Sequence, residues 1–318
     1  MFVGPGRQGF EHVYETFVKW VEKVEEVEKV EATASSFDND ASKSLAVAST
    51  SSTSSTSSTS FPMNRIEQLF QQKDKNVLNI YFTAGYPGLN DTEDIILALE
   101  KSGVDLVEVG MPYSDPLADG PTIQESGTAA LENGMTLQLL FEQLAAVRKK
   151  TEMPLIMMGY FNQVMQYGEK AFFEKVAEVG VDGLILPDLP LFEYENHYKD
   201  LVESLGLAVS FLITPQTEPE RIRKIDDLTH GFIYIVSSSS ITGAKSEITD
   251  TQIAYFNRIN DMQLKNKRLI GFGISNHETF ETACQYANGA IIGSAYIKAL
   301  KNNPNVAECT AEFVTAIL

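Results

Sequence analysis

Cysteine and histidine are scarce in this chain of 318 residues, and their scarcity excludes several kinds of chemistry. The two cysteines, Cys284 and Cys309, are too few for the disulfide framework of a small secreted domain and lack the paired spacing of a zinc site. The four histidines are scattered, with no HExxH motif and no close pair. Hydrolytic zinc chemistry is therefore not expected, and the few cysteines favour a reducing, cytoplasmic location.

Long apolar runs and an excess of basic residues are also missing. No stretch approaches the roughly 18 apolar residues that span a bilayer, and the N-terminus lacks the order of basic, apolar and small residues typical of a signal peptide. Asp and Glu outnumber Lys and Arg by 43 to 25, for a net charge of -18. Because phosphate backbones and anionic lipids are bound by clustered Lys and Arg, we expect neither a nucleic acid nor a membrane as partner.

Residues 1–62 differ in composition from everything that follows. Residues 49–60 are only Ser and Thr, which bury too little to offset the entropy of ordering, so we expect disorder there. Before them, apolar residues recur at steps of three and four, as in a short amphipathic helix: Phe10, Val13, Phe17, Trp20, Val24 and Val27. The extension is either a partner-binding helix on a tether or upstream sequence from a wrongly chosen start, with Met63 as the natural first residue. The marginal stability of so short a helix favours the second interpretation.

Residues 63–318 read as one domain, with enough apolar sequence for a large core, in which helix, turn, apolar strand and polar loop recur. Strands are expected at 77–83, 106–110, 154–159, 183–187, 207–213, 232–236, 268–273 and 290–293. Helical patterns lie between them, at 91–101, 137–149, 170–179, 193–205, 219–227, 250–264 and 277–286. Eight alternations over roughly 255 residues match a (β/α)8 TIM barrel. A doubly wound open sheet is the alternative, but no GxGxxG fingerprint follows the first strand.

The segment 107–124 sends an apolar strand into a loop that is rich in carboxylates. Glu108 is expected at the end of the strand, where parallel barrels carry out their chemistry, and Asp115 and Asp119 follow in the loop. Prolines between residues 112 and 121 fix several φ angles, so the loop has a defined shape that can aim its carboxylates. A hydrated acidic loop is the alternative interpretation. We expect a catalytic rim.

Glycine-containing loops follow the last three expected strands, at 237–243, 271–275 and 293–296, where barrels commonly bind phosphate. Glycine lets backbone N–H groups approach an anion closely, and Ser294 is expected to cap the next helix while donating its hydroxyl. The loop 237–243 could close as a lid. A single glycine after a strand is more often only a turn, but three at consecutive strand ends indicate a phosphate site.

The expected ligand is a phosphorylated small molecule with an apolar portion, handled by carboxylates opposite the phosphate. Aromatic and apolar side chains at or near the expected strand ends are the candidates for contact with that portion: Tyr81, Met158, Tyr160, Ile185, Leu212, Tyr234 and Phe272. Each could instead belong to the barrel core, because inward residues of barrel strands pack in layers below the site.

From Met63 onward the sequence closely resembles one family, the alpha subunit of tryptophan synthase. The resemblance rests above all on residues 108–124, and further matching segments follow in the family's order: 63–66, 82–88, 184–190, 242–243, 271–275 and 293–295. It implies a TIM barrel that cleaves indole-3-glycerol phosphate into indole and glyceraldehyde 3-phosphate, a retro-aldol reaction of tryptophan biosynthesis.

The resemblance also implies roles for individual residues. Glu108 would be the acid–base group, and Asp119 would accept the indole N–H. Gly243, Gly273, Gly293 and Ser294 would hold the phosphate, with Tyr234 near it. The indole pocket would comprise Tyr81, Met158, Tyr160, Ile185, Leu212 and Phe272, and Thr242 would belong to a lid that touches Asp119. Two features depart from the usual pattern, namely the serines at 238–240 in the lid and Tyr81 where Phe is common.

No metal or cofactor is implied for this chain. The family's alpha subunit docks on a beta subunit that holds pyridoxal phosphate, in an alpha2-beta2 tetramer, and indole passes to it through a tunnel. Three alternatives stay open: a silent barrel that only activates its partner, a related barrel that forms indole-3-glycerol phosphate by ring closure, and a lyase that works without a beta subunit. Glu108 and Asp119 argue against the first, and the second needs a strand-end Lys that no expected strand supplies.

Overall fold

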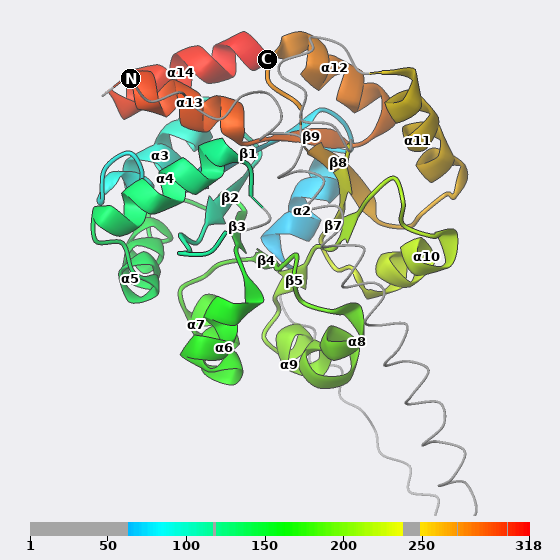
Figure 1. Cartoon of the computed structure of the whole chain (residues 1–318), viewed down its shortest axis with the longest axis horizontal. Helices are drawn as coiled ribbons and strands as arrows, with labels where there is room; N and C mark the ends of the chain where they lie inside the picture. Colours follow the sequence, from blue (N-terminus) through cyan, green and yellow to red (C-terminus); the bar gives the residue numbers. More distant parts are fainter. Residues whose placement is uncertain (1–62, 117–118, 238–248, 272, 304) are drawn as a thin grey trace, which may run out of the picture.

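The computed structural model describes residues 63–116, 119–237, 249–271, 273–303 and 305–318, and in it a parallel sheet curls into a barrel surrounded by helices (Figure 1). The strands are β1 Val77–Thr83, β2 Leu106–Gly110, β3 Leu155–Met158, β4 Gly183–Ile185, β5 Ala208–Val209, β6 Leu212–Ile213, β7 Phe232–Val236, β8 Lys267–Gly271 and β9 Gly289–Ile292. Their order in the sheet is β5-β4-β3-β2-β1-β9-β8-β7-β6. The predicted strands are therefore present, and β1, β2 and β7 have the predicted bounds.

The barrel closes through an interruption in its fifth strand. The sequence predicted one strand over 207–213, but the structure has β5 and β6 with Ser210 and Phe211 between them. The Ser210 hydroxyl accepts the N–H of Phe232 at 3.2 Å, and the Phe211 carbonyl accepts the N–H of Tyr234 at 2.9 Å. Since β5 pairs with β4 and β6 pairs with β7, the two pieces together are the fifth strand of the predicted (β/α)8 TIM barrel.

Helices cover the outside of the sheet (Figure 1). Six of the predicted helices are α3 Asp91–Lys101, α5 Leu137–Val147, α7 Glu169–Glu178, α10 Pro219–Leu228, α11 Asp250–Asp261 and α12 His277–Tyr286. The helix predicted at 193–205 is divided into α8 Leu191–Glu193, the π-helix η1 Tyr194–Tyr198 and α9 Lys199–Ser204. No helix in the described part of the chain is both long and apolar enough to cross a membrane.

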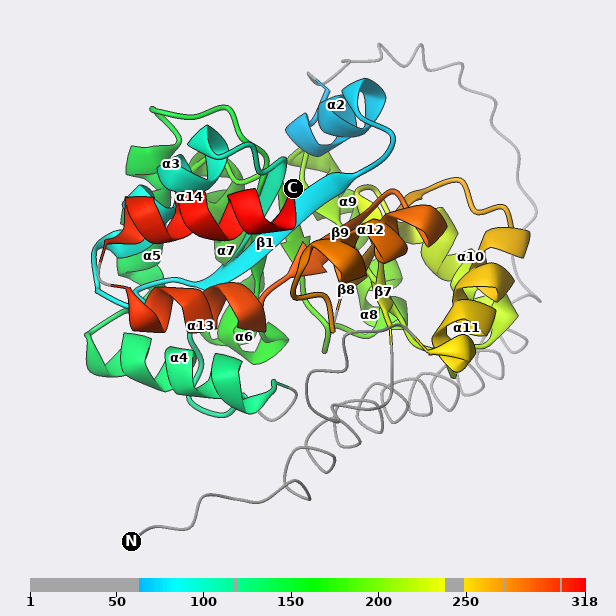
Figure 2. The ribbon, with the colours of Figure 1, turned by 90° about the horizontal axis from the view of Figure 1, so that it is seen from above.

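Further helices lie outside the predicted ranges, namely α2 Arg65–Gln72, α4 Pro121–Glu132, α6 Phe161–Tyr167 and α14 Val306–Ile317, and the helix expected after Ser294 is α13 Ser294–Asn302. Of these, α4, α6 and α13 each begin shortly after a barrel strand ends, and Figure 2 places them toward the end of the barrel opposite α2. Pro121 is the first residue of α4, a position that needs no backbone N–H. Three helix N-termini therefore lie toward the carboxyl ends of the strands.

The core has two parts, one between sheet and helices and one inside the barrel. The inner part comprises Val77, Leu106, Ile156, Ile185, Ala208, Phe232, Tyr234, Val236, Leu269 and Ile291, together with Ile66 and Phe70 from α2. The rings of Phe70 and Phe232 lie 6.2 Å apart, edge to face. Because α2 closes the amino end of the barrel with apolar side chains, the carboxyl end is left for a site (Figures 1 and 2).

Candidate active site

Glu108 lies inside the barrel rather than at its rim. It is the central residue of β2, in register with Tyr81 of β1 and Ile156 of β3, and its side chain is 0% exposed. The sequence placed it at the end of the strand, but the strand continues for two more residues to Gly110. The carboxyl group is therefore held by rigid backbone and kept from water.

Burial dominates the electrostatics of Glu108. Removal from water disfavours the charged form and raises the pKa of the Glu108 carboxyl to about 8, and a hydrogen bond from Asn79 partly opposes that shift. The Asn79 Nδ2 donates to Glu108 Oε1 at 2.5 Å. The other oxygen, Oε2, is buried without a hydrogen-bond partner among the described residues. A carboxyl that titrates near neutral pH can both give and take a proton, as acid–base catalysis requires.

Asp119 occupies the rim, in the loop that leads from β2 into α4. Gln124 of α4 donates from Nε2 to the Asp119 carbonyl at 2.8 Å, and the Asp119 N–H donates to the Pro116 carbonyl at 3.0 Å, so the backbone of the loop is held at both sides of the residue. Burial raises the pKa of the Asp119 carboxyl to about 7, while a hydrogen bond from Tyr160 acts in the opposite direction. The pKa of the second carboxyl group is thus also close to neutral pH.

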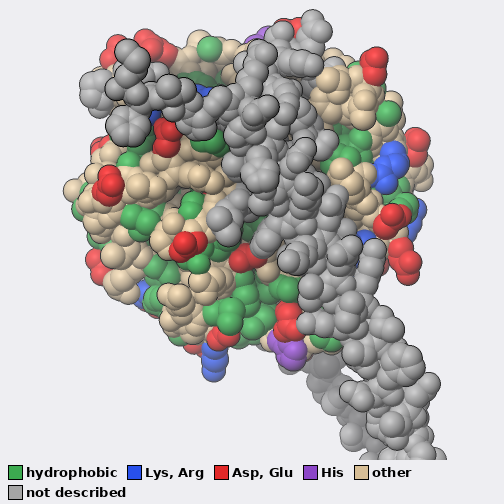
Figure 3. Space-filling model, in the orientation of Figure 1, with side chains coloured by type: hydrophobic (Ala, Val, Ile, Leu, Met, Phe, Trp, Pro, Cys, Tyr) green, Lys and Arg blue, Asp and Glu red, His purple; other side chains and the backbone are tan. Residues whose placement is uncertain are grey.

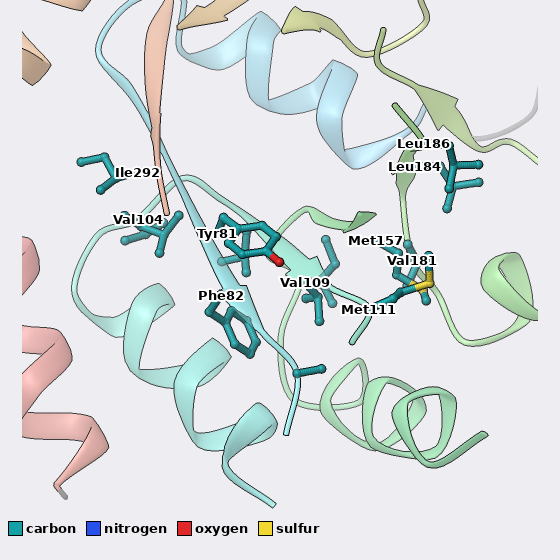
Figure 4. Close-up of a cluster of buried hydrophobic side chains, with 14 of the residues drawn as sticks. Tyr81, Phe82, Val104, Val109, Met111, Met157, Val181, Leu184, Leu186 and Ile292 are labelled. Carbon is teal, nitrogen blue, oxygen red and sulfur yellow. The ribbon is translucent and has the colours of Figure 1, made fainter. Parts of the chain in front are cut away.

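Tyr81 lies near both carboxylates. Burial raises the pKa of its hydroxyl, and the negative charges of Asp119 and Glu108 raise it further, so the phenol stays neutral at working pH. Figure 4 shows the hydroxyl directed across β2. A Cβ on Gly110 would lie 2.1 Å from this oxygen, which explains why β2 ends in glycine. The two carboxylates and Tyr81 therefore form one cluster at the carboxyl end of β1 and β2.

Most residues of the predicted indole pocket come together beside this cluster. Met158, Tyr160, Ile185 and Leu212 all pack against or within the inner core. Ile185 is completely buried, whereas the other three remain partly exposed and can touch a ligand. The ring of Tyr160 also contacts that of Tyr113 in the rim loop, with ring centroids 5.1 Å apart and the planes tilted by 31°. Tyr160 therefore joins the apolar pocket to Asp119, while Phe272 lies outside the described residues.

The predicted phosphate residues are placed at the ends of β8 and β9. Gly273 is exposed with φ of 79°, a conformation that favours glycine, and Gly293 precedes the first turn of α13. The prediction that Ser294 caps α13 is wrong: Gly293 is the N-cap, and Ser294 is the exposed first helical residue, with no side-chain cap hydrogen bond. The exposed start of α13 still presents backbone N–H groups and the positive end of its dipole.

Tyr234 was expected near the phosphate. It is 5% exposed, and a Cβ on Gly271 would lie 2.1 Å from its hydroxyl oxygen, so its ring lies over the last residue of β8. The same arrangement occurs between Tyr81 of β1 and Gly110 of β2, and one strand, β9, lies between β1 and β8 in the sheet. Gly243 and Thr242 lie outside the described residues, as do residues 1–62 with their predicted helix and Ser/Thr run.

Sequence reasoning missed Asn79 and the hydrogen bond between Tyr160 and Asp119. A signal for Asn79 was available, because it is a polar residue in an apolar strand and shares the inward face with Tyr81, two residues later. No comparable signal exists for Tyr160, since its contact with Asp119 joins two different loops. Across the described ranges, no group of three or more His, Cys, Asp or Glu side chains could hold a metal ion.

Comparison with known proteins gives one consistent result. Residues 67–317 match the family model described as tryptophan synthase alpha chain. The chain is 60% identical over 241 residues to the tryptophan synthase alpha chain of Flavobacterium psychrophilum, an alignment that covers 76% of this chain and 95% of that protein. The corresponding protein of Flavobacterium johnsoniae is 59% identical with the same coverage.

Solved structures agree with the sequence relatives. The structure resembles a chain of the tryptophan synthase complex from Pyrococcus furiosus, with a TM-score of 0.71 and 33% identity over 77% of this chain and 98% of that one. It also resembles a chain of Mycobacterium tuberculosis tryptophan synthase, with a TM-score of 0.72 and 30% identity over 80% and 99% of the two chains. At these identities the likeness extends beyond the barrel architecture.

Proposed function

The chain belongs to the tryptophan synthase alpha chain family, and from this premise we propose that Glu108 and Asp119 carry its reaction. The enzyme is a lyase of tryptophan biosynthesis that cleaves indole-3-glycerol phosphate into indole and glyceraldehyde 3-phosphate. The observation that supports the two catalytic roles best is the pair of carboxyl groups whose pKa values burial raises to about 8 and about 7 beside one tyrosine.

The proposed mechanism uses the two carboxyl groups in different protonation states. Neutral Glu108 donates its proton to C3 of the indole ring, and the positive charge that develops at the ring N–H is stabilised by ionised Asp119. Glu108, now a carboxylate, removes the proton from the glycerol hydroxyl next to the ring. The bond between C3 and the glycerol chain breaks, its electrons return to the ring, and glyceraldehyde 3-phosphate leaves as an aldehyde. The proton that Glu108 gave is thereby replaced.

We propose that the phosphate binds at the exposed start of α13. Gly293 and Ser294 lie there, Gly273 follows the neighbouring strand, and the helix dipole favours a dianion at this place. Gly243 is proposed to complete the site, with Tyr234 behind it. The indole would lie among Tyr81, Met158, Tyr160, Ile185, Leu212 and Phe272, under a lid that includes Thr242.

The chain acts as an alpha subunit that pairs with a beta subunit, and we propose an alpha2-beta2 tetramer. The exposed Asp115, on the same rim loop as Asp119, is proposed to face the partner. This chain is proposed to need no cofactor, because the protonated indole ring itself accepts the electrons of the broken bond; pyridoxal phosphate would belong to the beta subunit. A phosphorylated substrate and two buried, free thiols support a cytoplasmic location.

The experiment that tests this function is indole release from indole-3-glycerol phosphate, with and without a beta subunit from the same source. Glu108→Gln should lose about a thousandfold in rate, the scale of general acid–base catalysis, while keeping the thermal unfolding of a folded barrel. Glu132→Gln, an exposed carboxylate on α4, is the control and should keep full activity. Full activity of Glu108→Gln would refute the role of Glu108, and absence of release from the unaltered chain would favour the silent activating barrel.

A further inference from the structure

Asn79 donates a side-chain hydrogen bond to the Glu108 carboxyl. It lies on β1, two residues before Tyr81, in a strand whose residues are all buried, and it is itself 0% exposed. Burial of an amide in an apolar barrel is unfavourable unless the amide forms hydrogen bonds. Its hydrogen bond to Glu108 Oε1, at 2.5 Å, is therefore the interaction that the position provides.

The remaining polar atoms of this pair share one feature. Asn79 Oδ1 and Glu108 Oε2 are both buried and have no hydrogen-bond partner among the residues that the structure places. An amide has a donor at Nδ2 and an acceptor at Oδ1, whereas a carboxyl is acceptor-only when ionised and gains a donor when protonated. Asn79 can therefore donate to ionised Glu108 through Nδ2, and, after a half-turn of the amide, accept from protonated Glu108 through Oδ1.

We propose that Asn79 is a positioning residue that keeps the Glu108 carboxyl hydrogen-bonded in both protonation states of the catalytic cycle. The inference rests on the proposed acid–base role of Glu108, in which the same carboxyl is neutral before C3 is protonated and ionised afterwards. A permanently charged Lys or Arg at this position would stabilise only the carboxylate, and an apolar residue would stabilise neither state. An amide suits both.

The other groups around Glu108 do not provide this function. On β1 the titratable neighbour is Tyr81, whose neutral hydroxyl also interacts with Asp119 at the rim. On β3 the residue in register is Ile156, which is apolar. Of the two hydrogen bonds that Asn79 can form, the one to the ionised carboxylate is the stronger, so Asn79 lowers the pKa of Glu108 against the effect of burial. Its loss should therefore raise that pKa further and make the carboxylate intermediate less stable.

The first test is the pH dependence of indole release in Asn79→Leu, which removes the amide and keeps a similar volume. The fall in rate at alkaline pH, the alkaline limb that reflects ionisation of Glu108, should move to a pH higher by about one unit. This shift corresponds to a tenfold change in the ionisation constant of Glu108. We expect kcat to fall about tenfold, by the same relation, while KM stays nearly unchanged. Thr229→Val is the control, because it removes a buried hydroxyl that bonds the Ile225 carbonyl on α10 and should leave the limb in place. A limb that coincides with that of the unaltered enzyme would overturn the proposal.

The second test needs neither activity nor a variant at Asn79. In the unaltered chain labelled with [15N]asparagine, one side-chain amide signal should shift as Glu108 titrates, and this shift should vanish in Glu108→Gln. Absence of any such signal would overturn the proposal even if Asn79→Leu failed to fold. The outcome is independent of the proposed function, which fails instead if Glu108→Gln keeps its rate of indole release.

Discussion

At the scale of single residues, the partner of a buried carboxylate decides what that carboxylate can do. Asp182 lies at the amino end of the barrel, where Arg148 and Arg65 bind its two oxygens at 2.9 and 3.0 Å. Glu108 is equally buried but has only the Asn79 amide. Burial raises the pKa of the Asp182 carboxyl too, but the Leu155 N–H and the two guanidinium groups act against that shift and make Asp182 a structural link, whereas the Asn79 amide is what opposes the effect of burial on Glu108.

The two raised pKa values predict a narrow, bell-shaped pH dependence of kcat/KM. Asp119 must be ionised, so the rate should rise as pH increases through about 7, and Glu108 must be protonated at the start, so the rate should fall as pH increases through about 8. Rates of indole release from about pH 5 to about pH 10 would check this. Asp119→Asn should remove the acidic limb. A profile that stays flat from about pH 5 to about pH 10 would contradict the assignment.

At the scale of elements, the helices that begin at the carboxyl ends of strands supply much of the proposed site. The loop that ends in α4 carries Asp119, Tyr160 is the N-cap of α6, and Ser294 opens α13. The α6 start is itself held, because the Phe161 N–H donates to Asp188 Oδ1 at 2.7 Å. Helix starts are rigid, so these side chains are held in position relative to the barrel.

Ser294→Asp tests the phosphate site at the start of α13. A carboxylate there should weaken binding of the substrate dianion and raise KM by about tenfold, on the order of the 1 kcal/mol that a charge gains at a helix end. The same charge interacts favourably with the helix dipole, so the melting temperature should not fall. Asn305→Asp at the N-cap of α14 is the matched control and should leave KM unchanged. If the two variants have equal KM values, the phosphate does not bind at the start of α13.

Phe70→Ala tests the function of α2 as the closure of the amino end. Loss of a ring that is 7% exposed and packs on Phe232 should reduce the free energy of unfolding by about 3 kcal/mol. The kcat of indole release should change little, because the site lies at the other end of the barrel. Gln71→Ala, exposed on the same helix, should affect neither quantity. Denaturant unfolding measures the free energy of unfolding, and steady-state rates measure kcat. A large fall in kcat with an unchanged free energy of unfolding would show that α2 acts on the active site and not only on stability.

At the scale of the whole molecule, one end of the barrel provides stability and the other provides chemistry. The amino end is sealed by α2 and by the ion pairs of Asp182, while the carboxyl ends of the strands carry both raised carboxylates. The excess of acidic groups does not form a single patch on the face shown in Figure 3, where red side chains are scattered. The net charge therefore does not indicate a docking surface on that face.

We predict that residues 63–318 are a complete catalytic unit. The family model begins at residue 67, and the alignment with the Flavobacterium psychrophilum relative covers 95% of that protein while leaving part of this chain unmatched. A chain that starts at Met63 should therefore unfold at the same temperature as the full chain and release indole at the same rate with a beta subunit. Loss of activation by the beta subunit in the shortened chain would instead support a partner-binding helix in the extension.

The positions of most barrel elements follow from the sequence because they depend on local patterns. Apolar runs between glycine-containing turns define β1, β2 and β7 to the residue, and the helical period defines α3 and α12. Glu108 could likewise be singled out because a carboxylate in an apolar strand conflicts with simple burial, and Asp119 because it follows in a loop whose shape prolines fix. The sequence alone therefore determined the barrel and pointed to Glu108 and Asp119.

Only the tertiary structure determined the contacts and the pKa values of these residues. The break between β5 and β6 depends on a hydroxyl that accepts a hydrogen bond from Phe232 on the neighbouring strand β7, and no local pattern records that contact. The same holds for Asn79 beside Glu108 and for Tyr160 beside Asp119, which lie on separate strands and loops. Periodicity along the chain shows which residues face inward. Closure of the sheet determines which of these residues contact each other and how deeply each is buried. Contacts and burial together set the pKa values on which the reaction depends.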